Sequence, residues 1–223
     1  MGTLITSNGG EPTASVSISE NSNAVTTVQA SVPAERAPAS YHLSGGADQA
    51  RFTIDPTSGA LRFISAPNFE NPQDLGDTAA NNTYVVQVTA SDTQGGSDAQ
   101  TLTVRVSNVN EAPVITSGTS AAIASNSPAG TLVYQATASD PDAGDTLTYN
   151  LSGTDASLLS VNPATGAITL KAAADINTQP GYSFSVVATD KGGLAGSKAV
   201  TVQVNTVPPE DTSTIAPTLK LAP

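Results

Sequence analysis

Thr83-Tyr84-Val85-Val86-Gln87-Val88-Thr89 alternates polar with apolar side chains, and Gln100-Thr101-Leu102-Thr103-Val104-Arg105-Val106 repeats that alternation. A period of two is the pattern of a β-strand with one buried face. Between the two segments, Gln94-Gly95-Gly96-Ser97 supplies glycines for a tight connection. Together they predict an antiparallel hairpin of two long strands.

Shorter segments of the same kind lie on both sides of this hairpin. No stretch of the chain has a helical period of useful length. Seven short strands in about 100 residues are typical of a β-sandwich, so the sequence predicts an all-β fold. The predicted strands cover residues 14–19, 24–30, 40–43, 51–54, 60–64, 83–90 and 99–106, and then 121–124, 131–137, 146–151, 158–161, 167–171, 182–188 and 197–204.

The second half of the chain repeats the first. Ile5-Thr6-Ser7 recurs as Ile115-Thr116-Ser117, and Thr57-Ser58-Gly59-Ala60 recurs as Ala164-Thr165-Gly166-Ala167. These matches predict two tandem modules of one fold, the first with about nine extra residues between positions 64 and 84. We place the first module in residues 1–111, with a connector at 107–113, the second module in 112–206, and a linker or the start of a further module in 207–223.

The composition limits the possible partners. The chain has 19 acidic and 8 basic residues and a formal net charge of −11. This charge repels nucleic acid and anionic membranes and attracts cations, so we expect no nucleic-acid partner. No apolar run reaches the roughly 18 residues of a membrane-spanning helix, so we expect no direct membrane insertion by this segment. We interpret the chain, which has no cysteine and lacks a signal-peptide pattern at its start, as a segment of a longer secreted or surface protein.

Acidic and amide residues gather at the predicted strand ends. The connector Asn108-Val109-Asn110-Glu111-Ala112-Pro113 ends in a proline, which removes a backbone donor, so its oxygens are available to something other than a β-ladder. The other such motifs are Ser19-Glu20-Asn21, Asn68-Phe69-Glu70-Asn71, Thr89-Ala90-Ser91-Asp92, Ala138-Ser139-Asp140-Pro141-Asp142 and Ala188-Thr189-Asp190. In this order, the motifs resemble the calcium motifs of cadherin repeats. They resemble more closely the cadherin-like repeats of large bacterial surface adhesins, including those of the repeats-in-toxin type.

This resemblance covers roughly residues 5–204 and implies two tandem seven-stranded Greek-key β-sandwiches joined end to end, with calcium at the junction. The family usually has Asp at the position of Asn108. An amide oxygen can still coordinate, but the lost negative charge lowers the expected affinity of one site. The implied calcium ligands are Glu20 and Glu70 from the first module, Asn108, Asn110 and Glu111 from the connector, and Asp140, Asp142 and Asp190 from the second module.

The chemistry of these side chains also favours calcium. Ca²⁺ takes roughly six to eight oxygen ligands at about 2.3–2.6 Å in a flexible geometry that loops can supply. With one histidine and no cysteine in the chain, zinc and copper are poor candidates. The ligands also exceed what Mg²⁺ usually takes directly from protein. A cation gripped by both modules and the connector would exist in one relative orientation only, and so would stiffen the pair.

The outer ends of the modules lack this ligand set. In the first module, residues 30–36 contain no paired Asp, so we expect the upper site, left with Asp92, to be empty. In the second module, Ala124-Ser125-Asn126 replaces the Ser-Glu-Asn motif, and Asp175-Ile176-Asn177 stands at the acidic position after the fifth strand. We therefore expect any downstream junction to hold calcium weakly.

Two further acidic segments have simpler interpretations. Asp55 starts Asp55-Pro56-Thr57-Ser58-Gly59, and the second copy has Asn162 in its place, which favours a turn cap over a metal ligand. The extra residues of the first module include Asp74 and Asp77. For these two, a solvated loop and a further set of calcium ligands are equally open.

The expected function is a calcium-stiffened adhesive segment at a bacterial cell surface or outside the cell, next to flanking repeats of the same polypeptide. Homophilic self-association and a passive stalk both remain open. The alternative is a calcium-dependent carbohydrate-binding module, for which the chain, with no Trp, offers few stacking residues. Catalysis is not expected, because His42, the only histidine, has no acid and nucleophile pattern around it.

Overall fold

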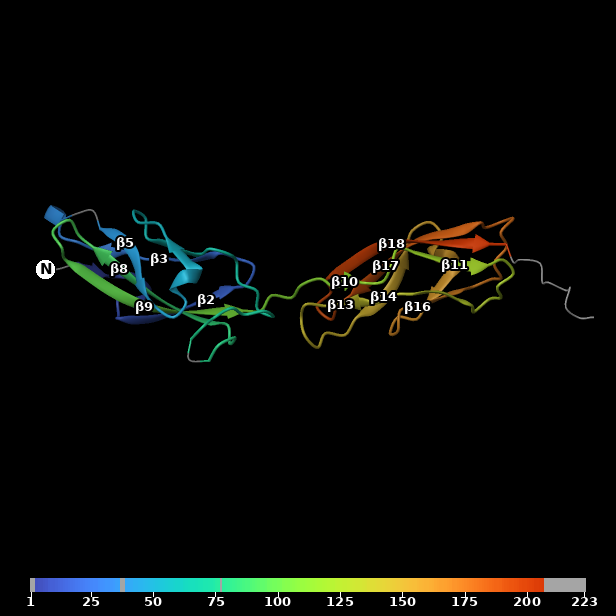
Figure 1. Ribbon diagram of the computed structural model, residues 1–223, viewed down its shortest axis with the longest axis horizontal. Helices are drawn as coiled ribbons and strands as arrows, with labels where there is room; N and C mark the ends of the chain where they lie inside the picture. The colour runs from blue at the N-terminus through green and yellow to red at the C-terminus, as the bar shows by residue number, and fades with distance from the viewer. Residues whose placement is uncertain (1–2, 37–38, 77, 207–223) are drawn as a thin grey trace, which may run out of the picture. The chain divides into compact units, whose positions relative to one another are not determined.

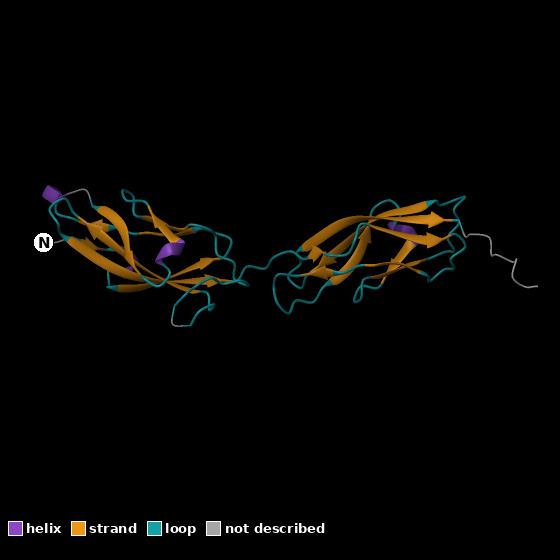
Figure 2. Ribbon diagram, viewed as in Figure 1, coloured by secondary structure: helices purple, strands orange, loops and turns teal. Residues whose placement is uncertain are grey.

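The computed structural model describes residues 3–36, 39–76 and 78–206 (Figure 1). The chain divides into two compact units, unit 1 at Met1–Val109 and unit 2 at Asn110–Pro223. Strands provide most of the regular structure in both units (Figure 2). The predicted all-β class and the two tandem Greek-key sandwiches are confirmed. The predicted linker at residues 207–223 lies outside the described residues.

Unit 1 is a sandwich of two mainly antiparallel sheets with an additional two-stranded ribbon. The strand β2 (Thr13–Ser19) runs parallel to β9 (Ser97–Ser107), and the other described pairs are antiparallel. The described residues of unit 1 also contain three short 3₁₀ helices, which are η1 (Ser7–Gly9), η2 (Ala34–Arg36) and η3 (Gln49–Arg51). The larger sheet has the order β2 (Thr13–Ser19), β9 (Ser97–Ser107), β8 (Thr83–Ser91) and β5 (Ser40–Gly45); the smaller sheet has β3 (Ala24–Thr27), β7 (Ala60–Phe63) and β6 (Phe52–Ile54); the ribbon pairs β1 (Leu4–Ile5) with β4 (Ala30–Ser31).

Unit 2 repeats this arrangement strand for strand. Here β11 (Ser120–Ala124) runs parallel to β18 (Ala195–Asn205), and the other described pairs are antiparallel. Its described residues also include the 3₁₀ helix η4 (Ala156–Leu158). The larger sheet has the order β11 (Ser120–Ala124), β18 (Ala195–Asn205), β17 (Gly181–Thr189) and β14 (Thr148–Ser152); the smaller sheet has β12 (Leu132–Gln135), β16 (Ala167–Leu170) and β15 (Leu159–Val161); the ribbon pairs β10 (Val114–Ile115) with β13 (Ala138–Ser139).

The core of unit 1 lies between the two sheets. Along β8, alternate residues are buried, which is the pattern that the sequence predicted for this strand. Three aromatic rings pack at the centre, with Phe63 4.3 Å from Phe52 and 5.0 Å from Tyr84 between ring centroids. Burial of each large apolar side chain contributes about 1.5–3 kcal/mol relative to exposure. The aromatic cluster therefore offsets some of the shortage of large residues elsewhere.

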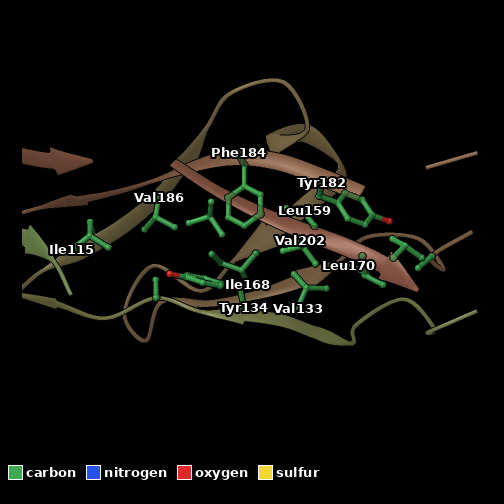
Figure 3. Packing of buried hydrophobic residues seen from close by; sticks show 14 of the residues in the cluster. Ile115, Val133, Tyr134, Leu159, Ile168, Leu170, Tyr182, Phe184, Val186 and Val202 are labelled. Carbon is green, nitrogen blue, oxygen red and sulfur yellow. The ribbon is translucent and has the colours of Figure 1, made fainter. Parts of the chain in front are cut away.

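The core of unit 2 has fewer rings and more aliphatic side chains. Figure 3 shows Phe184 pointing into the space between the sheets, where Ile168 and Tyr134 also lie. The rings of Tyr134 and Phe184 meet edge to face, with centroids 6.2 Å apart. Of the five tyrosines, Tyr41, Tyr84, Tyr134 and Tyr182 are buried and contribute to the two cores.

The second strand of each module is broken where the sequence predicted one continuous strand. In unit 1, Val28 lies between β3 and β4, and its N–H donates to the carbonyl of Gly59 at 2.8 Å. Gly59 has φ of +70°, and a Cβ there would lie 2.1 Å from the Val28 carbonyl oxygen. In unit 2, Gly166 has the same relationship to Ala136. The repeated glycine is thus required where the chain leaves one sheet for the ribbon.

The predicted tight turn after the fourth strand is confirmed in both units. The Oδ1 atom of Asp55 accepts hydrogen bonds from the N–H groups of Thr57 at 3.0 Å and Ser58 at 2.7 Å. Asn162 Oδ1 makes the equivalent contacts in unit 2. Because an amide oxygen does the same work as the carboxylate, Asp55 is a turn cap.

Among the described residues, no helix has the length and apolar character needed to cross a membrane.

Candidate metal centres

Asp190 occupies the turn that connects β17 to β18 in unit 2. Its Oδ1 accepts a hydrogen bond from the N–H of Leu194 at 2.8 Å, and its Oδ2 accepts one from the side-chain amide of Asn110 at 2.8 Å. Burial alone would raise the pKa of Asp190, but these hydrogen bonds and those from the glycine N–H groups of the turn hold the pKa below its ordinary value. The side chain is therefore kept ionised although it is only 6% exposed.

Asp142 and Asp140 follow directly after β13. The backbone N–H of Glu111 donates to Oδ2 of Asp142 at 2.7 Å, and the N–H of Asp142 donates to Oδ1 of Asp140 at 3.0 Å. The second oxygen of Asp140, Oδ2, is buried and accepts no hydrogen bond. A buried carboxylate oxygen without a donor costs free energy unless a cation or another donor satisfies it.

Three carboxylates converge at this end of unit 2. One oxygen each from Asp140, Asp145 and Asp190 lies within 4.8 Å of the others. Oxygens bound to one Ca²⁺ at about 2.3–2.6 Å can be separated by no more than about 5 Å. The arrangement therefore fits a calcium ion, and it places three like charges together that a cation would neutralise.

Asp145 was not among the predicted ligands. It lies beyond Gly144, whose φ of +94° turns the chain, and its N–H donates back to the carbonyl of Asp142 at 3.3 Å. This turn brings Asp145 back to the carboxylates that precede it. The signal was present in the sequence as a third aspartate at the end of Asp140-Pro141-Asp142-Ala143-Gly144-Asp145, directly after the glycine.

Two glycines in β18 and its preceding turn allow the connector to lie against unit 2. A Cβ at Gly192 would be 2.6 Å from Oδ1 of Asn110, and a Cβ at Gly196 would be 1.8 Å from the carbonyl oxygen of Pro113. Contacts this short exclude any larger residue without displacement of the connector. These glycines position Asn110, and sequence reasoning missed them because the approach is between segments far apart in the chain.

In unit 1, Glu20 is the central acidic residue at the end of the sandwich where the chain leaves the unit at Val109. It is 3% exposed, and it accepts hydrogen bonds from the N–H of Phe69 at 2.8 Å and from the N–H of Val109 at 2.9 Å. A carboxylate oxygen of Glu70 lies within 4.8 Å of one from Glu20. Asn108, by contrast, is exposed.

Seven of the eight predicted ligands thus lie in two groups, one in each unit. Unit 1 brings Glu20 and Glu70 together beside the backbone of Val109. Unit 2 brings its five predicted residues to one end through the contacts described above. The members of this second group are Asn110, Glu111, Asp140, Asp142 and Asp190.

The far end of unit 2 lacks the charge that Glu20 supplies in unit 1. Ser125 takes the place of Glu20, and its hydroxyl oxygen accepts the N–H of Ile176 at 3.1 Å just as Glu20 accepts that of Phe69. Asp175 is turned onto its own loop, where its Oδ1 accepts the N–H of Asn177 at 2.9 Å. That hydrogen bond is the main reason that the pKa of Asp175 is lowered. A neutral hydroxyl has replaced a charge, and the low calcium affinity expected for this end stays a prediction.

The insertion of unit 1 is organised by a buried carboxylate. Asp74 is 2% exposed, and its Oδ1 accepts hydrogen bonds from the N–H groups of Asn81 at 3.1 Å and Asn82 at 3.0 Å. Asp48, which is fully buried, accepts the N–H of Leu75 at 2.7 Å. Asp74 therefore shapes the loop from within, while Asp77 lies outside the described residues.

Comparison with known proteins finds similarity to cadherins. Residues 119–206 match the family model described as Cadherin domain. The chain is 30% identical over 190 residues to the Protocadherin-like wing polarity protein stan of Drosophila melanogaster, covering 81% of this chain and 5% of that protein. It is 33% identical over 188 residues to human Protocadherin-16, covering 82% of this chain and 5% of that protein. The chain thus spans about a twentieth of the length of these relatives.

Solved structures agree on the fold. The extracellular cadherin domains 3–6 of Protocadherin Gamma B2 match with a TM-score of 0.53 and 18% identity, over 91% of this chain and 47% of that one. Mouse Cadherin-23 EC22-24 matches with a TM-score of 0.51 and 22% identity, over 92% of this chain and 65% of that one. The comparisons therefore identify a cadherin domain in residues 119–206 and a cadherin-like β-sandwich fold in the chain.

Proposed function

We propose that this chain is a calcium-binding segment of tandem cadherin-like repeats in a secreted or cell-surface adhesin, and that calcium at the junction stiffens the repeats. The observation that carries the proposal is the group of Asp140, Asp145 and Asp190, whose oxygens lie within 4.8 Å of one another. Asp140 adds a buried oxygen that accepts no hydrogen bond. A divalent cation supplies the charge and the coordination that this group requires.

The connector supports a role for calcium in coupling the units. Val109 is hydrogen-bonded to Glu20 of unit 1, and the next residue, Asn110, is hydrogen-bonded to Asp190 of unit 2. Each acidic group is therefore tied to one side of the same peptide bond. We infer that Glu20 and Glu70 contribute to the calcium site together with Asn108, Asn110, Glu111, Asp140, Asp142, Asp145 and Asp190. Binding that requires ligands from both units would favour one relative orientation.

The expected stabilisation is modest at millimolar calcium. Modules of this kind bind Ca²⁺ with dissociation constants of about 10⁻⁴ to 10⁻³ M. At about 10 mM calcium, one such site adds roughly 1.4–2.7 kcal/mol to the free energy of unfolding. This is enough to be measured by thermal unfolding.

The setting is also a proposal. We infer that the segment acts outside the cell, within a bacterial surface adhesin of the repeats-in-toxin type, either through homophilic association or as a stalk for a distant binding domain. The bacterial assignment rests on the resemblance of the calcium motifs, since the relatives named above are animal proteins. For the carbohydrate-binding alternative, burial of Tyr41, Tyr84, Tyr134 and Tyr182 withdraws most of the aromatic rings that could stack on a sugar.

The test is a calcium titration of the whole chain, followed by thermal unfolding and small-angle scattering. Wild type should gain stability and lengthen as calcium rises. Asp142→Asn should lose most of both effects. Asp55→Asn removes the same charge from a turn where unit 2 already has Asn162, and should behave as wild type. A wild type whose melting temperature and shape ignore calcium contradicts the proposal.

A further inference from the structure

Asp92 in unit 1 occupies the same place in the fold as Asp190 in unit 2. Ser91 pairs with Ser97 at the end of the β8–β9 ladder, and Thr189 pairs with Ala195 at the end of the β17–β18 ladder. Each aspartate follows directly and caps the turn with Oδ1, Asp92 accepting the N–H groups of Gln94 and Gly96 at 2.8 Å. The turn and its carboxylate are therefore shared by the two units.

The partners of the second oxygen differ. Oδ2 of Asp92 lies 3.6 Å from the guanidinium NH1 of Arg36 and accepts a hydrogen bond from the hydroxyl of Thr3 at 2.9 Å. At the matching end of unit 2, Asp190 instead lies beside the carboxylates of Asp140 and Asp145. Asp92 is thus paired with a guanidinium, whereas Asp190 lies next to two further carboxylates.

The residues that follow the ribbon strands β4 and β13 explain why the two ends carry different charges. Ala30 pairs with Ile5 in unit 1, and Ala138 pairs with Ile115 in unit 2. Counted from these alanines, Val32 stands where unit 2 has Asp140, and Ala34 stands where it has Asp142. The two acidic residues have been replaced by apolar ones, and a basic residue follows in η2.

The position of Arg36 is fixed by the turn that Asp92 caps. The carbonyl oxygen of Arg36 accepts hydrogen bonds from the N–H of Thr93 at 3.3 Å and from its hydroxyl at 3.2 Å. The side chain of Asp92 is fully buried, while that of Arg36 is 33% exposed. A buried carboxylate needs a compensating charge or several donors, and here it has both.

We infer that Arg36 acts as a built-in cation at this end of unit 1, in the position where the matching end of unit 2 uses a metal ion, so that this end is stable without calcium. The inference rests on the proposed calcium site of unit 2 for the comparison, but the role of Arg36 itself does not depend on it. The two equivalent ends therefore differ in their response to calcium. The end of unit 2 is stabilised by a bound ion, whereas the end of unit 1 is stabilised by Arg36 and does not need calcium.

The ionisation of Asp92 is consistent with this. Burial alone would raise its pKa, but the N–H groups of Gln94 and Gly96, the hydroxyl of Thr3 and the charge of Arg36 together hold the pKa below its ordinary value. The carboxylate is thus charged at neutral pH with no added cation.

The first experiment compares Asp92→Asn with Asp190→Asn in the whole chain, with bound calcium counted by equilibrium dialysis. Asp190→Asn should weaken calcium binding at least tenfold. Asp92→Asn should leave both the number of ions and their affinity within about twofold of wild type, because Arg36 takes the place of an ion beside Asp92. A loss of calcium in Asp92→Asn equal to that in Asp190→Asn would overturn the inference.

The second experiment removes calcium with a chelator and measures hydrogen exchange of β8–β9 in unit 1 and β17–β18 in unit 2. Arg36→Gln and Asp92→Asn should each accelerate exchange in unit 1 alone, and the double variant should be no worse than the more severe single variant. Arg62→Gln, which removes a positive charge of unit 1 that is exposed, is the matched control and should have little effect.

The two proposals can fail separately. Additive effects of Arg36→Gln and Asp92→Asn in chelator would overturn the role of Arg36 and leave the calcium proposal intact. A wild-type chain that binds no calcium would overturn the proposed function, and with it the comparison to unit 2, even where the coupling of Arg36 to Asp92 is observed.

Discussion

The N–H of Val109 donates a hydrogen bond to Oε1 of Glu20 at 2.9 Å, so the last residue of unit 1 is fixed to the end of its own sandwich. The other carboxylate oxygen of Glu20, Oε2, accepts a hydrogen bond from the N–H of Phe69 at 2.8 Å. One carboxylate therefore holds both the exit of the chain and the loop that carries Glu70. Removal of its charge should affect structure and metal binding together.

Glu20→Gln should destabilise unit 1 by about 1–3 kcal/mol, because a glutamine side chain can accept only one of the two N–H groups and turns a donor toward the other. It should also weaken calcium binding. Urea unfolding in chelator measures the first effect, and a calcium titration measures the second. Glu11→Gln, at an exposed position, is the control. Unchanged urea unfolding of Glu20→Gln would show that the two hydrogen bonds contribute no stability.

Asp145→Asn should lower calcium affinity without a comparable loss of stability in chelator. Its carboxylate is within 4.8 Å of those of Asp140 and Asp190, so its removal relieves repulsion in the metal-free protein and removes a ligand from the bound one. The expected signature is a metal-free melting temperature equal to or above that of wild type, with a smaller rise on calcium addition. A rise as large as in wild type would exclude Asp145 from the site.

Gly196→Ala should disrupt the seat of the connector on unit 2. The added Cβ would lie 1.8 Å from the carbonyl oxygen of Pro113, which is a backbone atom and cannot rotate away. We expect a loss of about 2–4 kcal/mol in the free energy of unfolding, together with weaker calcium binding. Gly118→Ala is the matched control, since a Cβ there meets nothing within 4 Å. Equal stability of the two variants would mean that the connector does not need this close approach.

Acid should destabilise unit 1 partly through Asp92. Its pKa is lowered in the folded state, so its ionised form stabilises the fold at neutral pH, and that contribution is lost as the pH falls below the ordinary value of 3.8 toward the folded pKa. In chelator, wild type should therefore lose stability more steeply than Asp92→Asn as the pH falls below about 4. Chemical unfolding at several pH values gives both slopes, and identical slopes would remove Asp92 from the acid response.

The strands and turns followed from the sequence because their signals are local. The alternation in residues 83–89 and the turn residues Asp55 and Asn162 depend on neighbours only a few positions away. The ribbon strand Leu4–Ile5 was missed because two residues are too few to show a period. The break at Val28 was missed because it depends on Gly59, which is distant in the sequence.

The candidate site was predictable to the same extent. Acidic residues at strand ends could be read directly from the sequence, and the resemblance of their motifs to cadherin motifs indicated which of them share a calcium site. Asp145 needed the backward turn at Gly144, and the pairing of Arg36 with Asp92 joins residues that are remote in the chain and have no common motif. Contacts of this kind depend on tertiary structure, and a single sequence does not encode them in any local pattern.

The parallel pairing of β2 with β9 bears on mechanical load. Strand β2 lies near the start of unit 1 and β9 at its end, and their ladder extends from Thr13 with Thr101 to Ser19 with Ser107. Tension applied to the two ends of the unit pulls these neighbours lengthwise past each other, so every rung of the ladder is strained at once. A hairpin pulled from its open end would instead lose its rungs in succession. Unit 1 is therefore built to resist shear, which is the stress that an extended tether experiences.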